Sequence, residues 1–221
     1  MVTKIKICGI KRSEDAVFSA SLGVDFFGLI FVRGSHRYLS VSVAKNLVSS
    51  FHNNTSNHDV KIVGVFANEK LDKITNLIDE CSLDVVQLCS EEPIDYVKNI
   101  QCPVIKQIRI PSTGINNKVL LRIMDKIKSY KDVGCDILLD TLDVGSLGGT
   151  GRKFDWSVAE EISSHYPVWL AGGLDSSNVV SAIESVKPYA VDVSSGVETK
   201  KNKDLNKIKD FVDAVRNSVP M

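Results

Sequence analysis

The sequence predicts a closed barrel of eight parallel strands, each followed by a helix, which is a (β/α)8 or TIM barrel. Eight apolar runs of strand length recur along the 221 residues, and the stretches between them have the spacing of amphipathic helices. The runs are continuously apolar, as in parallel strands that are covered on both faces. An open, doubly wound sheet is the main alternative, but eight repeats in about 220 residues favour closure.

The predicted strands are rich in Val, Ile, Leu and Phe. In chain order they cover residues 5–8, 26–31, 61–66, 84–88, 104–108, 137–140, 168–171 and 189–193. Helical spacing is clearest over residues 16–20, 71–78, 119–127, 179–183 and 205–215. Ser13 is expected to cap the first helix, ahead of Glu14 and Asp15. The polar residues 52–59 are expected to form a surface loop, and because no linker-like composition divides the chain, residues 1–221 are expected to form one domain.

Composition excludes several classes of function. Twenty-seven Lys and Arg balance 27 Asp and Glu, so neither a nucleic acid nor an acidic membrane is expected as a partner. The N-terminus has no signal-like segment, and no apolar run approaches the roughly 18 residues that span a bilayer, so a cytoplasmic location is expected. The five cysteines are odd in number and irregularly spaced, which predicts reduced thiols and neither disulfides nor a metal site.

Polar and glycine-rich residues gather where the predicted strands end, which in a barrel is one rim. They are Cys8 after the first strand, Gly34 to Arg37 after the second, Cys89 and Ser90 after the fourth, Asp140 at the end of the sixth, Gly148 to Gly151 beyond it, Gly172 and Gly173 after the seventh, and Ser194 to Gly196 after the eighth. Glycines after the last two strands let backbone amides approach an anion, and these loops are where barrels often bind phosphate. The Gly148 segment lacks a P-loop ending and is expected to be a lid over a ligand.

Cys8 is the candidate reactive group. Strand alternation puts Lys6 on the same side as Cys8 and puts Ile5 and Ile7 on the other, so Lys6 should face the barrel interior. A buried ammonium must be paired, and Asp192, on the strand that closes the barrel beside the first, is the expected partner. A cation near Cys8 should favour the thiolate, which is the reactive form. The alternative is that Cys8 is a buried, inert apolar residue.

Asp140 and Arg37 complete the candidate site. Asp140 is either a helix cap or lysine partner, or an acid on the same rim as Cys8. Arg37 is either a surface cation or, on that rim, a guanidinium suited to bidentate recognition of a carboxylate. An arginine opposite a phosphate pocket predicts a ligand with two anionic ends.

From residue 4 to about residue 204, the chain resembles the phosphoribosylanthranilate isomerase family. These are (β/α)8 enzymes of tryptophan biosynthesis. The resemblance rests on an ordered set of motifs: Lys6-Ile7-Cys8-Gly9-Ile10, Phe27-Gly28-Leu29-Ile30-Phe31, Ser35-His36-Arg37-Tyr38, Val63-Gly64-Val65-Phe66, Val86-Gln87-Leu88, Leu138-Leu139-Asp140-Thr141, Gly148-Gly149-Thr150-Gly151 with Phe154-Asp155-Trp156, Ala171-Gly172-Gly173-Leu174, and Asp192-Val193-Ser194-Ser195-Gly196-Val197-Glu198. It implies an Amadori rearrangement of N-(5-phosphoribosyl)anthranilate to the 1-deoxyribulose phosphate, without metal or organic cofactor. The implied partner is a small phosphoribosyl substrate, and a monomer or homodimer is expected.

The resemblance also implies a role for each candidate residue. Asp140 would be the general acid that protonates the ribose ring oxygen, and Cys8 the general base that takes the C2′ proton. Arg37 would bind the anthranilate carboxylate. The phosphate would be held by Gly149, Gly173, Ser195 and Gly196, and the site would be supported by Lys6, Asp192 and Cys89.

Two departures from the family pattern bear on activity. The family usually has Gln-Leu-His-Gly after the fourth strand, where this chain has Gln87-Leu88-Cys89-Ser90, so turnover is reduced unless His36 on another loop compensates. The loop from Val197 to Asp204 lacks the usual glycine, which affects loop shape more than chemistry. The missing imidazole leaves open a barrel that binds a phosphate ligand but has lost catalysis. A third hypothesis, the related aminoimidazole carboxamide ribotide isomerase, ranks last because that enzyme would need an aspartate where Cys8 stands.

Overall fold

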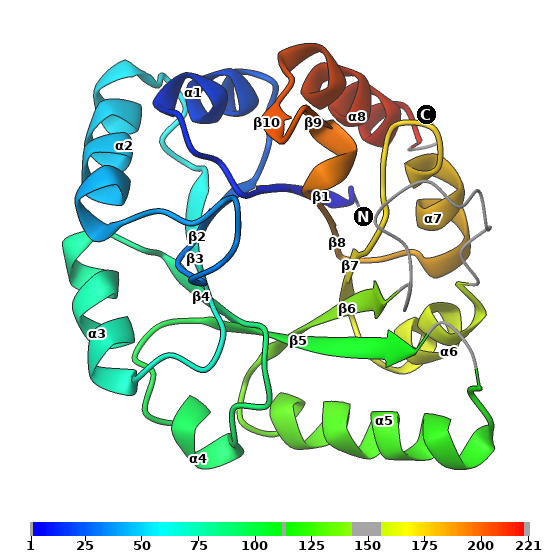
Figure 1. Cartoon of the computed structure of the whole chain (residues 1–221). Helices are drawn as coiled ribbons and strands as arrows, with labels where there is room; N and C mark the ends of the chain where they lie inside the picture. Colours follow the sequence, from blue (N-terminus) through cyan, green and yellow to red (C-terminus); the bar gives the residue numbers. More distant parts are fainter. Residues whose placement is uncertain (1, 112–113, 143–155, 219–221) are drawn as a thin grey trace.

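The predicted barrel is present and closed. The computed structural model describes residues 2–111, 114–142 and 156–218, and its parallel strands pair in chain order until the last pairs with the first. The strands are β1 (Lys4–Cys8), β2 (Phe26–Ile30), β3 (Lys61–Phe66), β4 (Val85–Leu88), β5 (Val104–Pro111), β6 (Asp136–Leu142), β7 (Val168–Ala171) and β8 (Ala190–Val193). Figure 1 looks down the barrel and shows the strands inside a ring of helices. Every predicted strand is confirmed, although β5 and β6 run further than the apolar runs indicated, and the open sheet is excluded.

The helices cover the outside of the barrel. They are α1 (Ser13–Ser21), α2 (Val41–Asn54), α3 (Leu71–Glu80), α4 (Ile94–Val97), α5 (Asn117–Lys131), α6 (Ser157–His165), α7 (Val179–Val186) and α8 (Leu205–Asn217). The end of α2 takes up the start of the polar stretch that was predicted as a loop, so only residues 55–59 of that stretch are non-helical.

The prediction that Ser13 caps the first helix is wrong. Ser13 is already the first residue of α1, and Arg12 occupies the N-cap position without a side-chain cap. Arg12 instead donates two hydrogen bonds to Asp15, from Nε to Oδ2 at 3.0 Å and from Nη2 to Oδ1 at 2.6 Å. The bidentate pair therefore fixes the start of α1 in place of a hydroxyl cap.

Three further observations concern the thiols, membrane spans and metal sites. All five cysteines are free thiols. Across the described residues no helix has the length and apolar character that a bilayer span requires. Over the same residues no group of three or more His, Cys, Asp or Glu side chains is placed to hold a metal ion.

Buried side chains form two layers, one between the barrel and the helices and one inside the barrel. Ile5 and Ile7 belong to the outer layer, whereas Cys8 belongs to an inner cluster that also contains Trp169. Lys6 is fully buried. Because successive residues of a strand point to opposite faces, the predicted inward direction of Lys6 and Cys8 is confirmed. The inner cluster fills the barrel beneath the rim and supports the residues that lie there.

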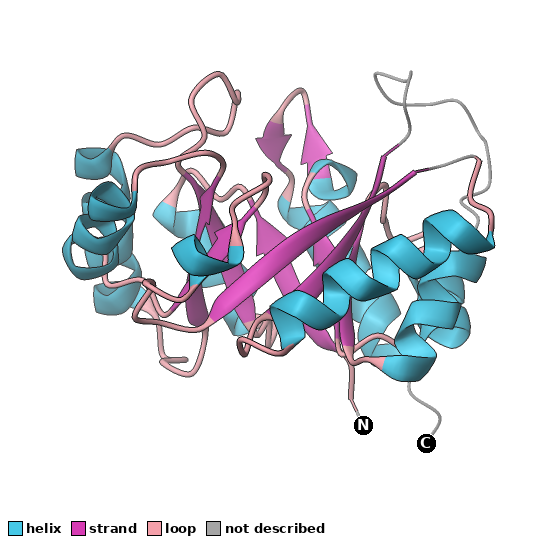
Figure 2. Cartoon of the chain, turned by 90° about the horizontal axis from the view of Figure 1, so that it is seen from below, coloured by secondary structure: helices cyan, strands magenta, loops and turns pink. Residues whose placement is uncertain are grey.

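One element has no counterpart in the eight repeats. After β8 the chain makes a single 3-10 turn, η1 (Ser195–Val197), and then an antiparallel hairpin of β9 (Glu198–Thr199) and β10 (Asn202–Lys203). Figure 2 shows the hairpin at one end of the barrel. The hairpin turns at Lys200 and Lys201, whose φ angles are 50° and 65°, in the left-handed region that a type I′ turn needs. The loop is therefore a tight turn built without the glycine or asparagine that such turns favour.

Replacing Lys201 with glycine should stabilise the protein by about 0.5 to 1 kcal/mol, because a lysine is strained at positive φ and a glycine is not. The free energy of unfolding in urea measures the effect. Lys209→Gly is the matched control, because the same change inside α8 should cost about 1 kcal/mol. A Lys201→Gly variant no more stable than the wild type would show that the turn holds no strain.

Candidate active site

Cys8 ends β1 with its side chain inside the barrel. It is only 7% exposed, and in the sheet register it lies opposite Gly28 of β2. A Cβ atom at position 28 would lie 2.9 Å from the Cys8 Sγ, which is too close for carbon and sulfur. The carbonyl of Gly28 also accepts hydrogen bonds from the N–H groups of Gly9 and Ile10, at 2.9 and 3.0 Å. Gly28 therefore makes the space for the thiol and fixes the end of β1.

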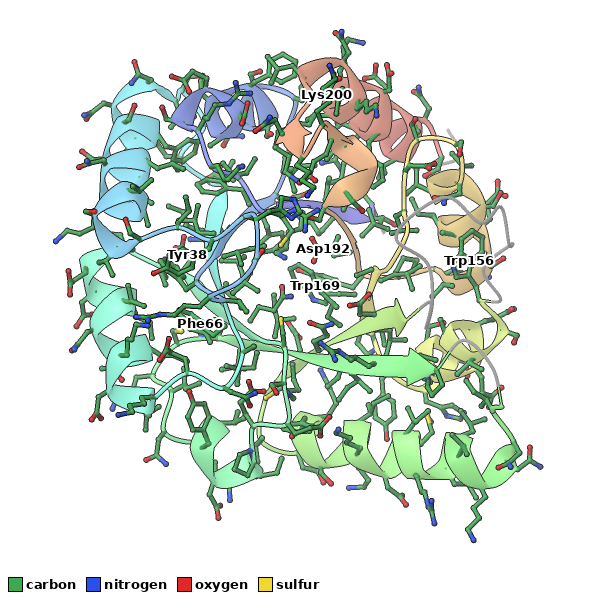
Figure 3. All side chains as sticks on the ribbon, viewed as in Figure 1. Tyr38, Phe66, Trp156, Trp169, Asp192 and Lys200 are labelled. Carbon is green, nitrogen blue, oxygen red and sulfur yellow. The ribbon has the colours of Figure 1, made fainter. Side chains whose placement is uncertain are left out.

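A buried chain of polar side chains crosses the barrel beside Cys8. The Lys6 ammonium donates to Asp192 Oδ2 on β8 and to Gln87 Oε1 on β4, both at 2.8 Å, so the predicted ion pair is present. Gln87 in turn directs its Nε2 at the Cys89 Sγ, 3.4 Å away. Figure 3 shows Asp192 near the barrel axis. Its Oδ1 is buried and has no hydrogen-bond partner among the described residues, so this carboxylate keeps an unused acceptor.

The charge beside Cys8 does not make it a thiolate in the free protein. Burial raises the pKa of Cys8, the Lys6 cation lowers it, Asp192 raises it, Lys203 lowers it, and the resulting pKa lies above the ordinary value of a thiol. The cation acts in the predicted direction, but desolvation of the buried sulfur outweighs it.

Asp140 lies on β6, at the same rim as Cys8. Leu138, two residues earlier on the strand, belongs to the inner cluster, so strand alternation turns Asp140 inward as well. Gln107 of β5 donates from Nε2 to Asp140 Oδ2 at 2.5 Å, which orients the carboxylate. The sequence prediction missed Gln107, although its inward direction follows from the same alternation, with Ile105 in the inner cluster.

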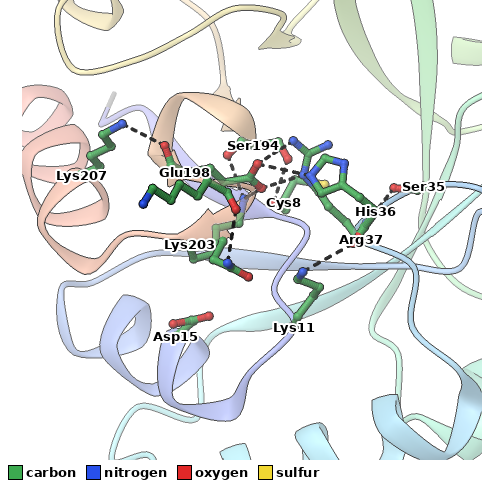
Figure 4. Close-up of polar contacts among 12 residues, drawn as sticks. Cys8, Lys11, Asp15, Ser35, His36, Arg37, Ser194, Glu198, Lys203 and Lys207 are labelled. Atoms are coloured by element: carbon green, nitrogen blue, oxygen red, sulfur yellow. Dashed lines mark hydrogen bonds and ion pairs between the residues drawn. The ribbon is translucent and has the colours of Figure 1, made fainter.

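Arg37, in the loop after β2, is held by a carboxylate of the protein itself. Its Nε donates to Glu198 Oε1 at 2.7 Å and its Nη2 to Oε2 at 2.8 Å (Figure 4). Lys203 Nζ also donates to Glu198 Oε1, at 2.9 Å. Burial alone would raise the pKa of Glu198, but the hydrogen bonds from Arg37 and Lys203 lower it to about 2. His36, expected as a possible substitute for the missing imidazole, places its Nε2 3.5 Å from Glu198 Oε2 and so lies in this cluster.

The loops after β7 and β8 pack against each other. Gly173 has a φ of 62°, and a Cβ atom at Gly196 would lie 2.0 Å from the Leu174 carbonyl oxygen, so only glycine fits at that crossing. Among the described residues, no backbone acceptor takes the N–H of Gly173, Ser195 or Gly196, and amides of this kind can bind an anion. The predicted phosphate contact Gly149 lies outside the described residues, as does the predicted lid around it.

The segment after β4 contains Cys89, and the backbone of this segment is fixed by other residues. Burial raises the pKa of Cys89 to about 12, although the Gln87 hydrogen bond opposes the rise, so Cys89 is a neutral thiol. Glu92 accepts the Ser90 N–H at 3.1 Å and pairs with the buried Lys106 of β5 at 2.6 Å. The sequence prediction did not include the pair of Glu92 and Lys106. This pair holds the loop in place whichever side chain stands at position 89.

Comparison with known proteins finds one family. Residues 5–214 match the family model for N-(5'phosphoribosyl)anthranilate (PRA) isomerase. The N-(5'-phosphoribosyl)anthranilate isomerase of Thermoanaerobacter pseudethanolicus is 38% identical over 216 residues, which cover 97% of this chain and 98% of the relative. The crystal structure of phosphoribosyl anthranilate isomerase from Thermotoga maritima aligns with a TM-score of 0.84 and 38% identity, covering 98% of this chain and 100% of that chain. Such an isomerase in complex with reduced 1-(o-carboxyphenylamino)-1-deoxyribulose 5-phosphate has a TM-score of 0.80 and 36% identity, with the same coverage.

Replacing Lys6 with methionine should lower the free energy of unfolding by about 3 to 5 kcal/mol, because it leaves the buried Asp192 carboxylate without its cation. Urea unfolding measures the change. Lys61→Met is the control, since the Lys61 pair with Asp84 is at the surface and should contribute less than about 1 kcal/mol.

The double variant Lys6→Met/Asp192→Leu should recover most of the stability lost in the single variant, because it removes both charges together. If Lys6→Met were as stable as Lys61→Met, the buried pair would have no special part in the fold.

Proposed function

The chain belongs to the N-(5'-phosphoribosyl)anthranilate isomerase family, and from this premise we propose that Cys8 is the general base and Asp140 the general acid of the family's reaction. The reaction is an Amadori rearrangement in tryptophan biosynthesis, from N-(5-phosphoribosyl)anthranilate to 1-(2-carboxyphenylamino)-1-deoxyribulose 5-phosphate. The observation that carries the proposal is one of placement. A thiol from β1 and a carboxylate from β6 stand at one rim, together with a guanidinium and two glycine loops.

The proposed substrate has an anion at each end, and the rim offers a binding group for each. Arg37 would take the anthranilate carboxylate through a bidentate contact. The proposed phosphate contacts are the backbone amides of Gly173, Ser195 and Gly196, together with Gly149. Holding both ends fixes the ribose between Cys8 and Asp140, and such positioning supplies a large part of the rate.

Two proton transfers then complete the proposed reaction. Asp140, in its acid form, gives a proton to the ribose ring oxygen, the bond from C1′ to that oxygen breaks, and the nitrogen lone pair forms an iminium. Cys8 must first lose its own proton, because burial raises its pKa in the free protein. Its thiolate then takes the proton from C2′, and the electron pair of that bond moves to give a neutral enolamine. The enolamine tautomerises to the ketone, so the product is an isomer of the substrate and no electrons are supplied from outside. Gln107 would orient Asp140 for the first step.

The proposed setting follows from the whole chain. We propose that residues 1–221 act as a single domain in the cytoplasm, on a small phosphoribosyl substrate and without nucleic-acid or membrane partners. The proposed assembly is a monomer or a homodimer; the related isomerase of Thermotoga maritima is dimeric. The balanced charge of the chain supports a small-molecule substrate bound by a local site.

Cys8→Ser and Asp140→Asn should each lower kcat by about 10²- to 10⁴-fold, because each removes one proton-transfer group. The assay generates the substrate from anthranilate and phosphoribosyl pyrophosphate and follows the fluorescence of the anthranilate group. Full turnover in both variants would exclude the proposed mechanism. A wild-type protein that binds a substrate analogue tightly without turnover would instead favour the phosphate-ligand binding barrel.

Cys89→His should raise kcat by roughly 2- to 10-fold, the worth of one hydrogen bond, because a neutral thiol is a poor donor and acceptor beside the substrate. The same fluorescence assay measures it. Cys89→Ala is the control and should leave kcat within about twofold of the wild type. A loss in Cys89→Ala as large as the loss in Cys8→Ser would mean that Cys89 itself transfers a proton.

A further inference from the structure

Glu198 and Lys203 have no part in the reaction proposed above, yet both are buried at the rim. They face each other across β9 and β10, and their side chains are 7% and 2% exposed. Glu198 is joined to Arg37, 161 positions earlier in the chain, by two hydrogen bonds. Burying charged groups costs free energy unless they are paired. Three of them at one point of the rim therefore call for an explanation beyond the stability of the hairpin.

Glu198 accepts hydrogen bonds from one edge of the Arg37 guanidinium and makes none with the other edge. The bonded edge is formed by Nε and one proton of Nη2 (Figure 4). An arginine carries donors on all three nitrogens, so Nη1 and the second Nη2 proton form another fork. Among the described residues that fork has no hydrogen-bond acceptor. A fork of this shape matches a carboxylate.

The stem of Arg37 is confined as firmly as its head. A Cβ atom at Gly9 would lie 2.4 Å from the Arg37 Cδ, and Gly9 itself has a φ of 80°. Gly9 directly follows Cys8 in the chain. The free edge of Arg37 is therefore presented beside the proposed base, with its aliphatic chain against Gly9 and its guanidinium against Glu198.

Clamping an arginine with a carboxylate has an electrostatic consequence. Arg37 and Glu198 alone form a neutral pair, which attracts a second carboxylate only weakly. Lys203 contacts the same carboxylate oxygen of Glu198 as Arg37 Nε does. With Lys203, the cluster of Arg37, Glu198 and Lys203 has a net charge of +1, so that one bound carboxylate neutralises it.

We propose that Lys203 is a specificity-determining residue for the substrate's carboxylate and that Glu198 is the positioning residue of Arg37. The proposal rests on the proposed function, since it takes the carboxylate end of that substrate as the ligand of Arg37. Lys203 supplies the net positive charge, Glu198 supplies the orientation, and Arg37 makes the contact.

Lys203 also reaches the proposed base. Its Nζ donates to the Ser194 carbonyl oxygen at 2.8 Å, and the Ser194 hydroxyl donates to the Cys8 carbonyl oxygen at 3.0 Å. Burial raises the pKa of Cys8, and of the charged groups that face it Lys6 from β1 and Lys203 from β10 lower the pKa, whereas Asp192 from β8 raises it. Loss of the Lys203 charge should therefore raise the pKa of Cys8 further, which gives a second readout besides binding.

The test compares two inhibitors by titration calorimetry. One is reduced 1-(o-carboxyphenylamino)-1-deoxyribulose 5-phosphate, and the other is the same compound without its carboxyl group. Lys203→Met should bind the carboxylated inhibitor about tenfold more weakly than the wild type does, with its affinity for the other inhibitor unchanged. The variant should fold, because Glu198 stays paired with Arg37.

Three further variants separate charge from structure. Lys203→Arg keeps the charge and should keep the preference for the carboxylated inhibitor. Lys207→Met is the matched control, because Lys207 is an exposed lysine that donates to the Glu198 carbonyl oxygen at 2.9 Å, and it should change neither affinity. Lys203→Met/Glu198→Gln returns the cluster to +1 and should regain part of the preference. The acid limb of kcat/KM should move to higher pH in Lys203→Met and return in Lys203→Arg.

Each failure has a distinct signature. Equal loss for both inhibitors in Lys203→Met, or no loss for either, would overturn the role of Lys203. Glu198→Asp keeps the charge but shortens the clamp, and a full carboxylate preference in that variant would overturn the role of Glu198. A wild-type protein without any preference for the carboxylated inhibitor would contradict the proposed role of Arg37 itself, and with it the proposed function.

Discussion

The ion pair between Lys6 and Asp192 is the interaction on which the rest of the rim depends. Closing the barrel brings β1 against β8 with these two residues in register, and strand alternation turns both inward. A buried ammonium persists only where its charge is matched and its donors are used. Asp192 matches the charge, and Asp192 and Gln87 together take two of the three donors. The same ion pair therefore joins β1 to β8 and sets the charge beside Cys8. A change that separated Lys6 from Asp192 would affect both the closure of the barrel and the electrostatics of the site.

The cluster of Arg37, Glu198 and Lys203 has a net positive charge, although the charges of the whole chain balance. The 27 Lys and Arg residues equal the 27 Asp and Glu residues, so no long-range field draws anions to the protein. In the cluster around Arg37, however, two cations, Arg37 and Lys203, face one carboxylate, Glu198. Glu198 and Lys203 both come from the hairpin after β8, which is the element outside the eight repeats. Their charges cancel, so the hairpin adds no net charge here, but it holds Arg37 and leaves the cluster with a net charge of +1.

Sequence alone predicts what depends on periodicity. The strands were found because parallel strands are apolar on both faces, and the inward direction of Lys6 and Cys8 followed from alternation. The effect of the Lys6 cation on Cys8 was predicted in the right direction, but the net pKa of Cys8 could not be predicted, because the depth at which a sulfur is buried is a property of packing and not of sequence neighbours. The β9–β10 hairpin was missed because Lys200 and Lys201 stand where the turn would usually show glycine or asparagine. Its contact with Arg37 spans most of the chain, which no local pattern encodes.

The substitution at position 89 is confined in its effects because the structure around it is set by other residues. Lys6 takes the Gln87 oxygen, so the amide must present its nitrogen to residue 89 whatever that residue is. The buried pair of Glu92 and Lys106 fixes the backbone of the loop. A thiol in this position accepts the Gln87 hydrogen bond only weakly, and it disturbs neither the Gln87 side chain nor the loop. Under the proposed function, its effect should therefore fall on the rate, through one hydrogen bond, while the barrel and the proposed contacts to the two anionic ends stay as they are.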